Sequence, residues 1–150
     1  MEIEMGMKKR MLSGVAAGIA AVGLLAGGAS AASALSYTPT PAVDGSPITV
    51  TSTGSLPAGG YRVGVCTVQT FGSGPTAAPA CGALTNVTHG GGVLVATTGT
   101  VFETGNANAH SVPALPAQPA DFDCDAPGSC EVVIVNHSTR ATVESATLAF

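Results

Sequence analysis

Short runs of alternating apolar and polar residues, separated by turn-forming residues, recur along the chain from about residue 36 to its end. Such runs, rich in Val, Thr and Ile, are typical of β-strands, because successive side chains of a strand point to opposite faces. The clearest runs are residues 48–51, 61–68, 84–88, 93–102 and 131–136. A first strand within residues 36–41 and a last one within residues 141–150 bring the expected number to about seven.

Composition supports strands over helices. Of the 150 residues, 20 are Gly and 10 are Pro, and only 9% are charged. Gly, Pro, Thr and Val are poor helix formers, so a coiled coil is excluded and a helical bundle is disfavoured. Gly90, Gly91 and Gly92 precede a strand, so they predict a turn rather than a phosphate-binding loop. We expect one all-β domain at residues 35–150, an immunoglobulin-like, seven-stranded Greek-key β-sandwich.

Residues 1–34 follow the order of a secretory signal peptide. Lys8, Lys9 and Arg10 form a basic cluster, and an apolar run follows at residues 11–26. Small residues then give two cleavage positions, after Ala31 or after Ala34. The alternative is a membrane anchor, but the apolar run is shorter than the roughly 20 residues that a spanning helix needs. We therefore expect a secreted, extracellular protein that has no membrane contact after cleavage.

Removal of the signal peptide leaves an acidic chain. The full sequence has 5 Lys and Arg against 9 Asp and Glu, of which three basic and two acidic residues precede residue 35. The mature domain thus keeps two arginines against seven carboxylates, a net charge of minus five. Such a surface repels phosphate groups, so direct binding to nucleic acid is not expected.

Four cysteines lie in the mature domain: Cys66, Cys81, Cys124 and Cys130. An even number in an exported chain indicates two disulfides, for which three pairings exist. The local pairing, Cys66 with Cys81 and Cys124 with Cys130, is favoured by the short separations in sequence. The alternative is a zinc site, which usually needs closely paired cysteines that this chain lacks.

No catalytic motif is visible in the sequence, and we expect no enzyme activity. The histidines are scattered among loop-like positions, and Ser111 beside His110 does not by itself make a catalytic pair. Asp121, Asp123 and Asp125 alternate and suggest weak calcium binding as an alternative to a solvated acidic edge. An EF-hand is excluded because Ala126 occupies its required Gly position, so we expect no metal site.

Residues 105–120 differ from the rest of the domain. They include three prolines and several polar residues, a composition typical of an irregular or extended excursion. Long loops of this kind serve either as functional segments or as variable surface, and the sequence leaves both alternatives open.

The order of several short motifs resembles the neocarzinostatin-type apoproteins, the family of macromomycin and actinoxanthin. The resemblance covers residues 37–150 and rests on both disulfide contexts. The motifs are Thr-Pro at 38–39, Asp-Gly at 44–45, LPAGGYRVGVC at 56–66, Ala-Cys at 80–81, Asp-Cys at 123–124, Cys-Glu-Val at 130–132 and TLAF at 147–150. Members of this family are small secreted bacterial sandwich proteins that hold an enediyne chromophore non-covalently.

The resemblance implies a ligand cleft beside the sandwich, walled by strand faces and disulfide-bounded loops. After Cys130, alternation places Glu131, Val133 and Val135 on one face of a strand, and Val132 and Ile134 on the other. The resemblance assigns the first face to the cleft and the second to the core.

On the earlier strand, the resemblance assigns Gly64, Cys66 and Val68 to the cleft. It also implies that Phe102 is an aromatic residue of the hairpin that flanks the cleft. The implied ligand-binding residues are therefore Gly64, Val68, Phe102, Glu131, Val133 and Val135.

Three of these positions depart from the family pattern. Val68 stands where some members have Trp, Val133 where they have a small Gly, and Val135 where they have Ser. The implied pocket is more apolar and shallower, with fewer rings to stack on a polycyclic ligand.

The sequence thus favours a non-enzymatic apoprotein that binds and protects an apolar, enediyne-like antibiotic chromophore. The expected partner is this small molecule, and DNA is reached only through the released, DNA-damaging chromophore. We expect a monomer without any other cofactor. The alternative is a structural or adhesive immunoglobulin-like module that has no small-molecule ligand.

Overall fold

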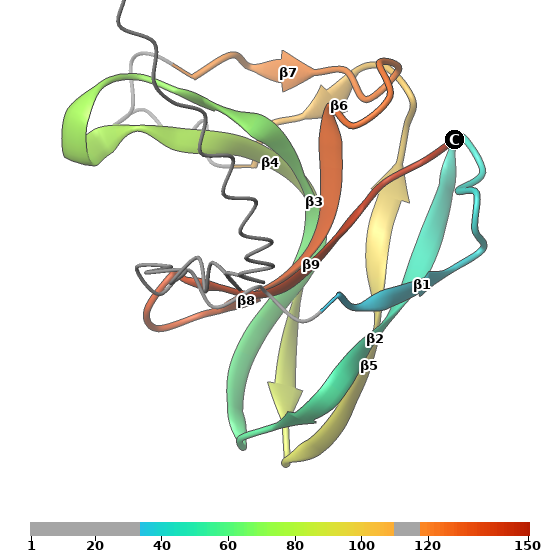
Figure 1. Ribbon diagram of the computed structural model, residues 1–150, viewed down its shortest axis with the longest axis vertical. Helices are drawn as coiled ribbons and strands as arrows, with labels where there is room; N and C mark the ends of the chain where they lie inside the picture. The colour runs from blue at the N-terminus through green and yellow to red at the C-terminus, as the bar shows by residue number, and fades with distance from the viewer. Residues whose placement is uncertain (1–33, 110–117) are drawn as a thin grey trace, which may run out of the picture.

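The computed structural model describes residues 34–109 and 118–150, which form layered β-structure (Figure 1). The predicted signal peptide therefore lies outside the described residues except for Ala34. The described elements are β1 (Ser36–Thr38), β2 (Ser46–Leu56), β3 (Gly59–Phe71), the 3-10 helix η1 (Gly74–Thr76), β4 (Ala78–His89), β5 (Gly92–Val101), β6 (Asn106–Ala107), β7 (Asp121–Phe122), β8 (Cys130–Asn136) and β9 (Thr142–Thr147).

The strands form two antiparallel sheets and a small ribbon. One sheet has the order β1-β2-β5, the other has the order β4-β3-β8-β9, and β6 pairs with β7. In Figure 1, β3 and β4 continue beyond the four-stranded sheet as a curved green hairpin, which we call the β3–β4 arm (residues 67–80). The turn between β8 and β9 lies on the same side of the molecule as this arm.

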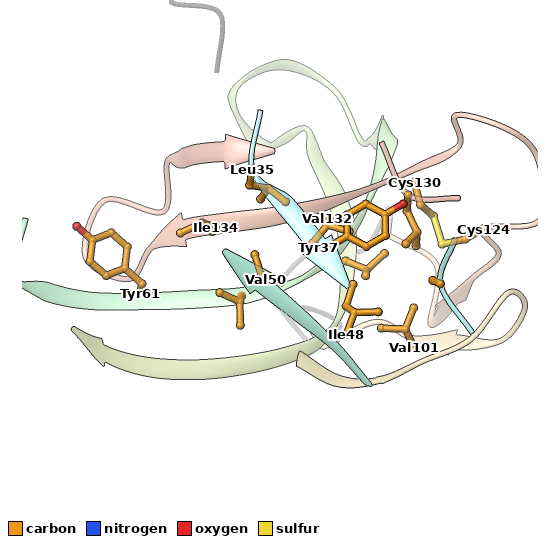
Figure 2. Packing of buried hydrophobic residues seen from close by; sticks show 14 of the residues in the cluster. Leu35, Tyr37, Ile48, Val50, Tyr61, Val101, Cys124, Cys130, Val132 and Ile134 are labelled. Carbon is orange, nitrogen blue, oxygen red and sulfur yellow. A yellow bond between two sulfur atoms is a disulfide. The ribbon is translucent and has the colours of Figure 1, made fainter. Parts of the chain in front are cut away.

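The two sheets share one apolar core, which makes the domain a β-sandwich. Ile48 and Val50 of β2 pack with Val132 and Ile134 of β8, and all four are fully buried. Figure 2 shows these side chains gathered between the layers. Burying a Val or Ile side chain contributes roughly 1.5–3 kcal/mol, so the inward positions of the alternating runs drive the layers together.

Both tyrosines also belong to this core. Tyr37 is 8% exposed and Tyr61 is 3% exposed (Figure 2). The Tyr37 hydroxyl donates to the Thr147 carbonyl over 3.2 Å, and the Tyr61 hydroxyl donates to the Pro57 carbonyl over 2.9 Å. Each buried hydroxyl thus has a partner, and Tyr37 links the first strand to the last.

The local disulfide pairing is confirmed. Cys66 is bonded to Cys81, and Cys124 to Cys130. The first bond joins β3 to β4, and the second joins the segment after β7 to the start of β8. No thiolate is then left for zinc, because all four sulfurs are used.

The all-β prediction is confirmed, and each of the expected runs contains a strand. The described residues hold nine strands rather than about seven. The difference is the β6–β7 ribbon, part of which lies in residues 105–120, where an irregular or extended excursion without a paired strand was expected. The predicted Greek-key connectivity stays a prediction. In the described part of the chain, no helix is long and apolar enough to span a membrane.

Candidate functional site

The four-stranded sheet carries a second apolar cluster on the face turned away from the core. Cys66, Cys81 and Val133 are almost fully buried there, with Leu84 and Val135 packed against them. Alternation along β8 explains the split, since Val132 and Ile134 enter the main core while the odd-numbered valines point the other way. The disulfide and the two valines thus form an apolar floor on this face.

A β-bulge in β4 brings Leu84 onto the same face. Val63 pairs with Thr85 and Val65 pairs with Gly82, so Gly64 lies opposite two residues, Ala83 and Leu84. Ala83 adopts a left-handed conformation with φ of 52°. An extra residue in one strand reverses the alternation beyond it. Leu84 therefore points to the same side as Cys81 instead of into the core.

Gly64 provides the space that Leu84 occupies. A Cβ atom at Gly64 would lie 2.6 Å from Leu84 Cδ2 and 2.8 Å from the Gly82 carbonyl oxygen. Real Cβ atoms do not come this close to other heavy atoms. Leu84 can lie across β3 only because this position has no side chain.

A cavity of about 300 Å³ opens above this floor, and we call it the disulfide cavity. This volume is at the lower end of the roughly 300–1,000 Å³ typical of small-molecule sites. Its lining comes from the sheet face, from the β3–β4 arm with Gln118, and from the end of β8 through the start of β9. The residues are Arg62, Cys66, Cys81, Leu84 and Val135; Ala78, Pro79 and Gln118; and Asn136, His137, Arg140 and Thr142.

The β8–β9 turn is held in place by its own hydrogen bonds. The Asn136 side-chain oxygen accepts from the backbone N–H groups of Ser138 (2.9 Å) and Thr139 (3.0 Å). The Arg140 N–H donates to the Asn136 carbonyl over 2.9 Å, and the His137 N–H donates to the Gly60 carbonyl over 3.0 Å. These bonds fix His137 and Arg140 at the edge of the cavity.

Gln118 fixes the opposite wall. Its side-chain N–H₂ donates to the carbonyl oxygens of Ala78 and Pro79, at 3.3 Å each. Its side-chain oxygen accepts from Asn108 Nδ2, also at 3.3 Å. Gln118, which precedes β7, thus connects the arm to this segment by hydrogen bonds. The Ala78 and Pro79 carbonyls accept these bonds from within the protein.

A second hollow of about 530 Å³ lies between the arm and the segment around β7, and it is more open to solvent than the disulfide cavity. Val68, Phe71 and Phe122 line it together with the carboxylates of Asp121 and Asp123. Asp123 already accepts a hydrogen bond from the Gly105 N–H over 2.8 Å. Among residues 34–109 and 118–150, no three His, Cys, Asp or Glu side chains gather closely enough to hold a metal ion.

Half of the residues assigned to the ligand lie in or under the disulfide cavity. Val135 lines it directly, Val133 is 1% exposed in the apolar cluster below, and Gly64 lies beneath Leu84. Glu131 is half-buried farther along the same strand and does not line the cavity.

Val68 and Phe102 lie elsewhere. Val68 is 57% exposed and lines the second hollow, beyond a register shift between Cys66 and Thr70. Phe102 is 41% exposed and its ring lies near Gly45, in neither hollow. His110 and Ser111 lie outside the described residues.

Sequence reasoning missed the polar part of the cavity. Arg62 precedes Gly64 by two residues, so alternation along the strand places it on the same face as Gly64. His137 and Arg140 are turn residues, and no periodicity reveals which way a turn residue points. Leu84 was missed because the bulge reverses its alternation.

Two solved structures have a similar fold. Macromomycin superimposes with a TM-score of 0.55 at 21% sequence identity, covering 77% of this chain and 96% of macromomycin. Apokedarcidin, known from its solution conformation, superimposes with a TM-score of 0.52 at 22% identity, covering 80% of this chain and 99% of apokedarcidin. The sequence matches no protein-family model and no curated protein. The resemblance predicted from the motifs is therefore confirmed in the fold.

Proposed function

We propose that this chain, which shares its fold with macromomycin and apokedarcidin, is a secreted carrier that binds an apolar small molecule non-covalently in the disulfide cavity. The observation that carries the proposal is the cavity itself. Leu84, Val135 and the Cys66–Cys81 disulfide give it an apolar floor, and hydrogen-bonded walls hold its shape. Small-molecule sites are typically preformed, concave and mostly apolar, with a few fixed polar groups.

The proposed ligand is an enediyne-like antibiotic chromophore, and the protein's part is binding, shielding and release. A chromophore in this cavity would be protected from water by the apolar floor. Damage to DNA would belong to the released chromophore, because the acidic protein repels phosphate groups. A carrier of this kind performs no catalysis.

Secretion and a monomeric state are also part of this proposal. Support for secretion comes from the charge, apolar and small-residue order of residues 1–34 and from the two disulfides. Reducing compartments rarely keep such bonds, so an oxidising destination agrees with both features.

Native mass spectrometry with absorbance, on protein purified from its own culture medium, tests the proposal. We expect added mass that organic extraction removes, together with a visible or near-ultraviolet band. Val135→Phe fills the cavity from its floor with a ring that takes the space of the ligand, and it should lower the affinity for the extracted compound by about tenfold or more, which corresponds to ~1.4 kcal/mol of lost binding free energy. Val95→Phe, on a strand residue that is 62% exposed, is the matched control and should bind normally.

A mass equal to residues 32–150 or 35–150 less four hydrogens, with no added species, would contradict the carrier proposal. It would favour the alternative, a structural or adhesive module without a ligand. Unchanged affinity in both Val135→Phe and Val95→Phe would show that the ligand binds somewhere other than the disulfide cavity.

A further inference from the structure

The positive charge of the mature domain is concentrated at one place. Arg62 and Arg140 are the two basic residues that follow the predicted signal peptide, since the sequence has no Lys after Lys9. Both line the disulfide cavity, and His137 lies beside them. The cavity of an acidic protein thus carries all of that domain's arginine charge.

The negative charge lies elsewhere. None of the described carboxylates lines the disulfide cavity: Asp44, Glu103, Asp121, Asp123, Asp125, Glu131 and Glu144. Glu131 shares the cavity face of β8 and pairs with Cys66, so its carboxylate lies near the disulfide without lining the cavity. It is four residues from Val135, about 13 Å along the strand, and so lies far from Arg62, which pairs with Val135. Glu144 pairs with the core residue Ile134 and is buried, and it accepts a hydrogen bond over 2.8 Å from the N–H of Thr53 in the other sheet. Its carboxylate therefore lies on the core side of the sheet.

The strand register shows that the two ends of the cavity have different residues. Arg62 pairs with Val135, and Val135 pairs with Thr142, so these residues form one row across the sheet. Cys66 follows Arg62 by four residues, about 13 Å farther along β3. One end of the cavity is therefore cationic and the other end is formed by the disulfide, with Leu84 between them.

The guanidinium groups are available to a ligand. Arg62 Nε donates to Asn86 Oδ1 over 3.0 Å, which orients the group and leaves its terminal N–H donors for other acceptors. Within the described residues, neither arginine forms an ion pair with a carboxylate. Arg140 is placed by the hydrogen-bonded turn, with a left-handed φ of 61°.

We infer that the ligand of the disulfide cavity carries an anionic group of the carboxylate class on an apolar body. The anion contacts Arg62 and Arg140, and the apolar body lies on Leu84 and the Cys66–Cys81 disulfide. Planar guanidinium groups match carboxylates in geometry, and a charge-assisted hydrogen bond is stronger than a neutral one. The inference rests on the proposed function, because it names the ligand class of the same cavity.

Three fluorescent probes of nearly the same shape test this inference on the disulfide-bonded protein: anthracene-9-carboxylate, neutral anthracene-9-carboxamide and cationic 9-(aminomethyl)anthracene. We expect the carboxylate to bind roughly tenfold more tightly than the amide, and the amine to bind most weakly. Added salt should weaken binding of the carboxylate probe and leave binding of the amide probe unchanged, because salt screens interactions between charges.

Substitutions locate the effect. Arg62→Gln and Arg140→Asn should each lower the affinity for the carboxylate probe by roughly threefold to tenfold. The affinity for the amide probe should change by less than about twofold. Arg140→Lys keeps the charge and should retain most of the carboxylate preference. Asn tolerates the left-handed conformation, so loss of binding in Arg140→Asn would not reflect a misfolded turn.

The outcomes separate this inference from the proposed function. Equal binding of all three probes, or equal losses for carboxylate and amide in the arginine variants, would overturn the anion preference while supporting an apolar carrier. Failure of all three probes to bind would contradict both the carrier function and the inferred anion preference. Carboxylate binding that Val135→Phe leaves intact would place the anion site outside the cavity and overturn the inference.

Discussion

Gly64 is the residue on which the shape of the cavity floor depends most directly. The substitution Gly64→Ala places a methyl group against Leu84 and the Gly82 carbonyl oxygen. We expect it to lower the free energy of unfolding by roughly 1–3 kcal/mol, as overpacked substitutions do. Urea unfolding measures the change.

Gly54→Ala is the matched control, because nothing lies within 4 Å of a Cβ atom at that strand position. It should change stability by less than about 0.5 kcal/mol. Equal effects of the two substitutions would show that backbone freedom, and not crowding by Leu84, explains the glycine at position 64.

Arg140 adopts a left-handed backbone conformation that lowers the stability of the β8–β9 turn. Its φ of 61° is unfavourable for most residues with a side chain, but Asn adopts it more easily. We expect Arg140→Asn to raise the free energy of unfolding by up to about 1 kcal/mol, and Arg140→Val to lower it, since β-branched residues fit this conformation worst. If thermal unfolding orders the two variants the other way, the turn does not hold this conformation in solution.

At the residue scale, the sequence predicts the floor of the site better than its rim. Alternation from Cys130 predicts that Val133 and Val135 share the face turned away from the core, as the structure has them, because a strand repeats every two residues. It fails for Leu84, where the bulge shifts the repeat by one, and it says nothing about His137. The resemblance assigned Val68 to the face of Gly64 and Cys66, but β3 has a register shift after Cys66 that the sequence does not reveal.

At the scale of elements, the β6–β7 ribbon docks on β4 at a glycine. A Cβ atom at Gly82 would clash with the carbonyl oxygen of Ala107 in β6, and it would lie 3.3 Å from the Phe122 ring in β7. The Ala109 N–H also donates to the Cys81 carbonyl over 2.7 Å. The ribbon therefore covers one end of the core through a close backbone contact.

We expect Gly82→Ala to displace this ribbon while the sandwich stays folded. Hydrogen exchange should be faster at the Ala109 amide and unchanged at Val63, which lies in the centre of β3. Gly90→Ala, where nothing lies within 4 Å of a Cβ atom, should leave both amides unchanged. Unchanged exchange at Ala109 in Gly82→Ala would contradict the close docking of the ribbon.

Apart from the three-residue β1, the elements that the sequence predicts are those with enough length to show a period. The runs that became β3, β5 and β8 contain 7 to 13 strand residues, and their inward valines fill the core. The ribbon strands contain two residues each, which is too short for any alternation to appear. The first part of β4 was also missed, because its Ala-Pro-Ala stretch lacks the β-branched residues typical of strands.

For the whole molecule, the two disulfides differ in what they constrain. Cys66 and Cys81 are separated by 15 residues, and Cys124 and Cys130 by 6. In the chain-entropy model, closing these loops stabilises the fold by roughly 3 and roughly 2 kcal/mol, respectively. Replacing each pair by alanine and measuring urea unfolding checks this order.

Only the first pair should also affect the ligand. The Cys66–Cys81 double variant removes part of the cavity lining, so binding of an anthracene probe should fall even under conditions where the variant stays folded. The Cys124–Cys130 variant keeps the lining and should bind normally while folded. Equal loss of binding in both would mean that the disulfides support the cavity only through overall stability.

The two buried tyrosines of the core have an optical consequence. The chain has no Trp and only these two Tyr, both enclosed between the sheets. Tyrosine emission is therefore an internal signal of an intact sandwich, and the mature protein is nearly transparent at longer wavelengths. A ligand that absorbs where tyrosine emits would quench that emission by energy transfer, so occupancy of the cavity and folding of the core could be followed in a single cuvette without any label.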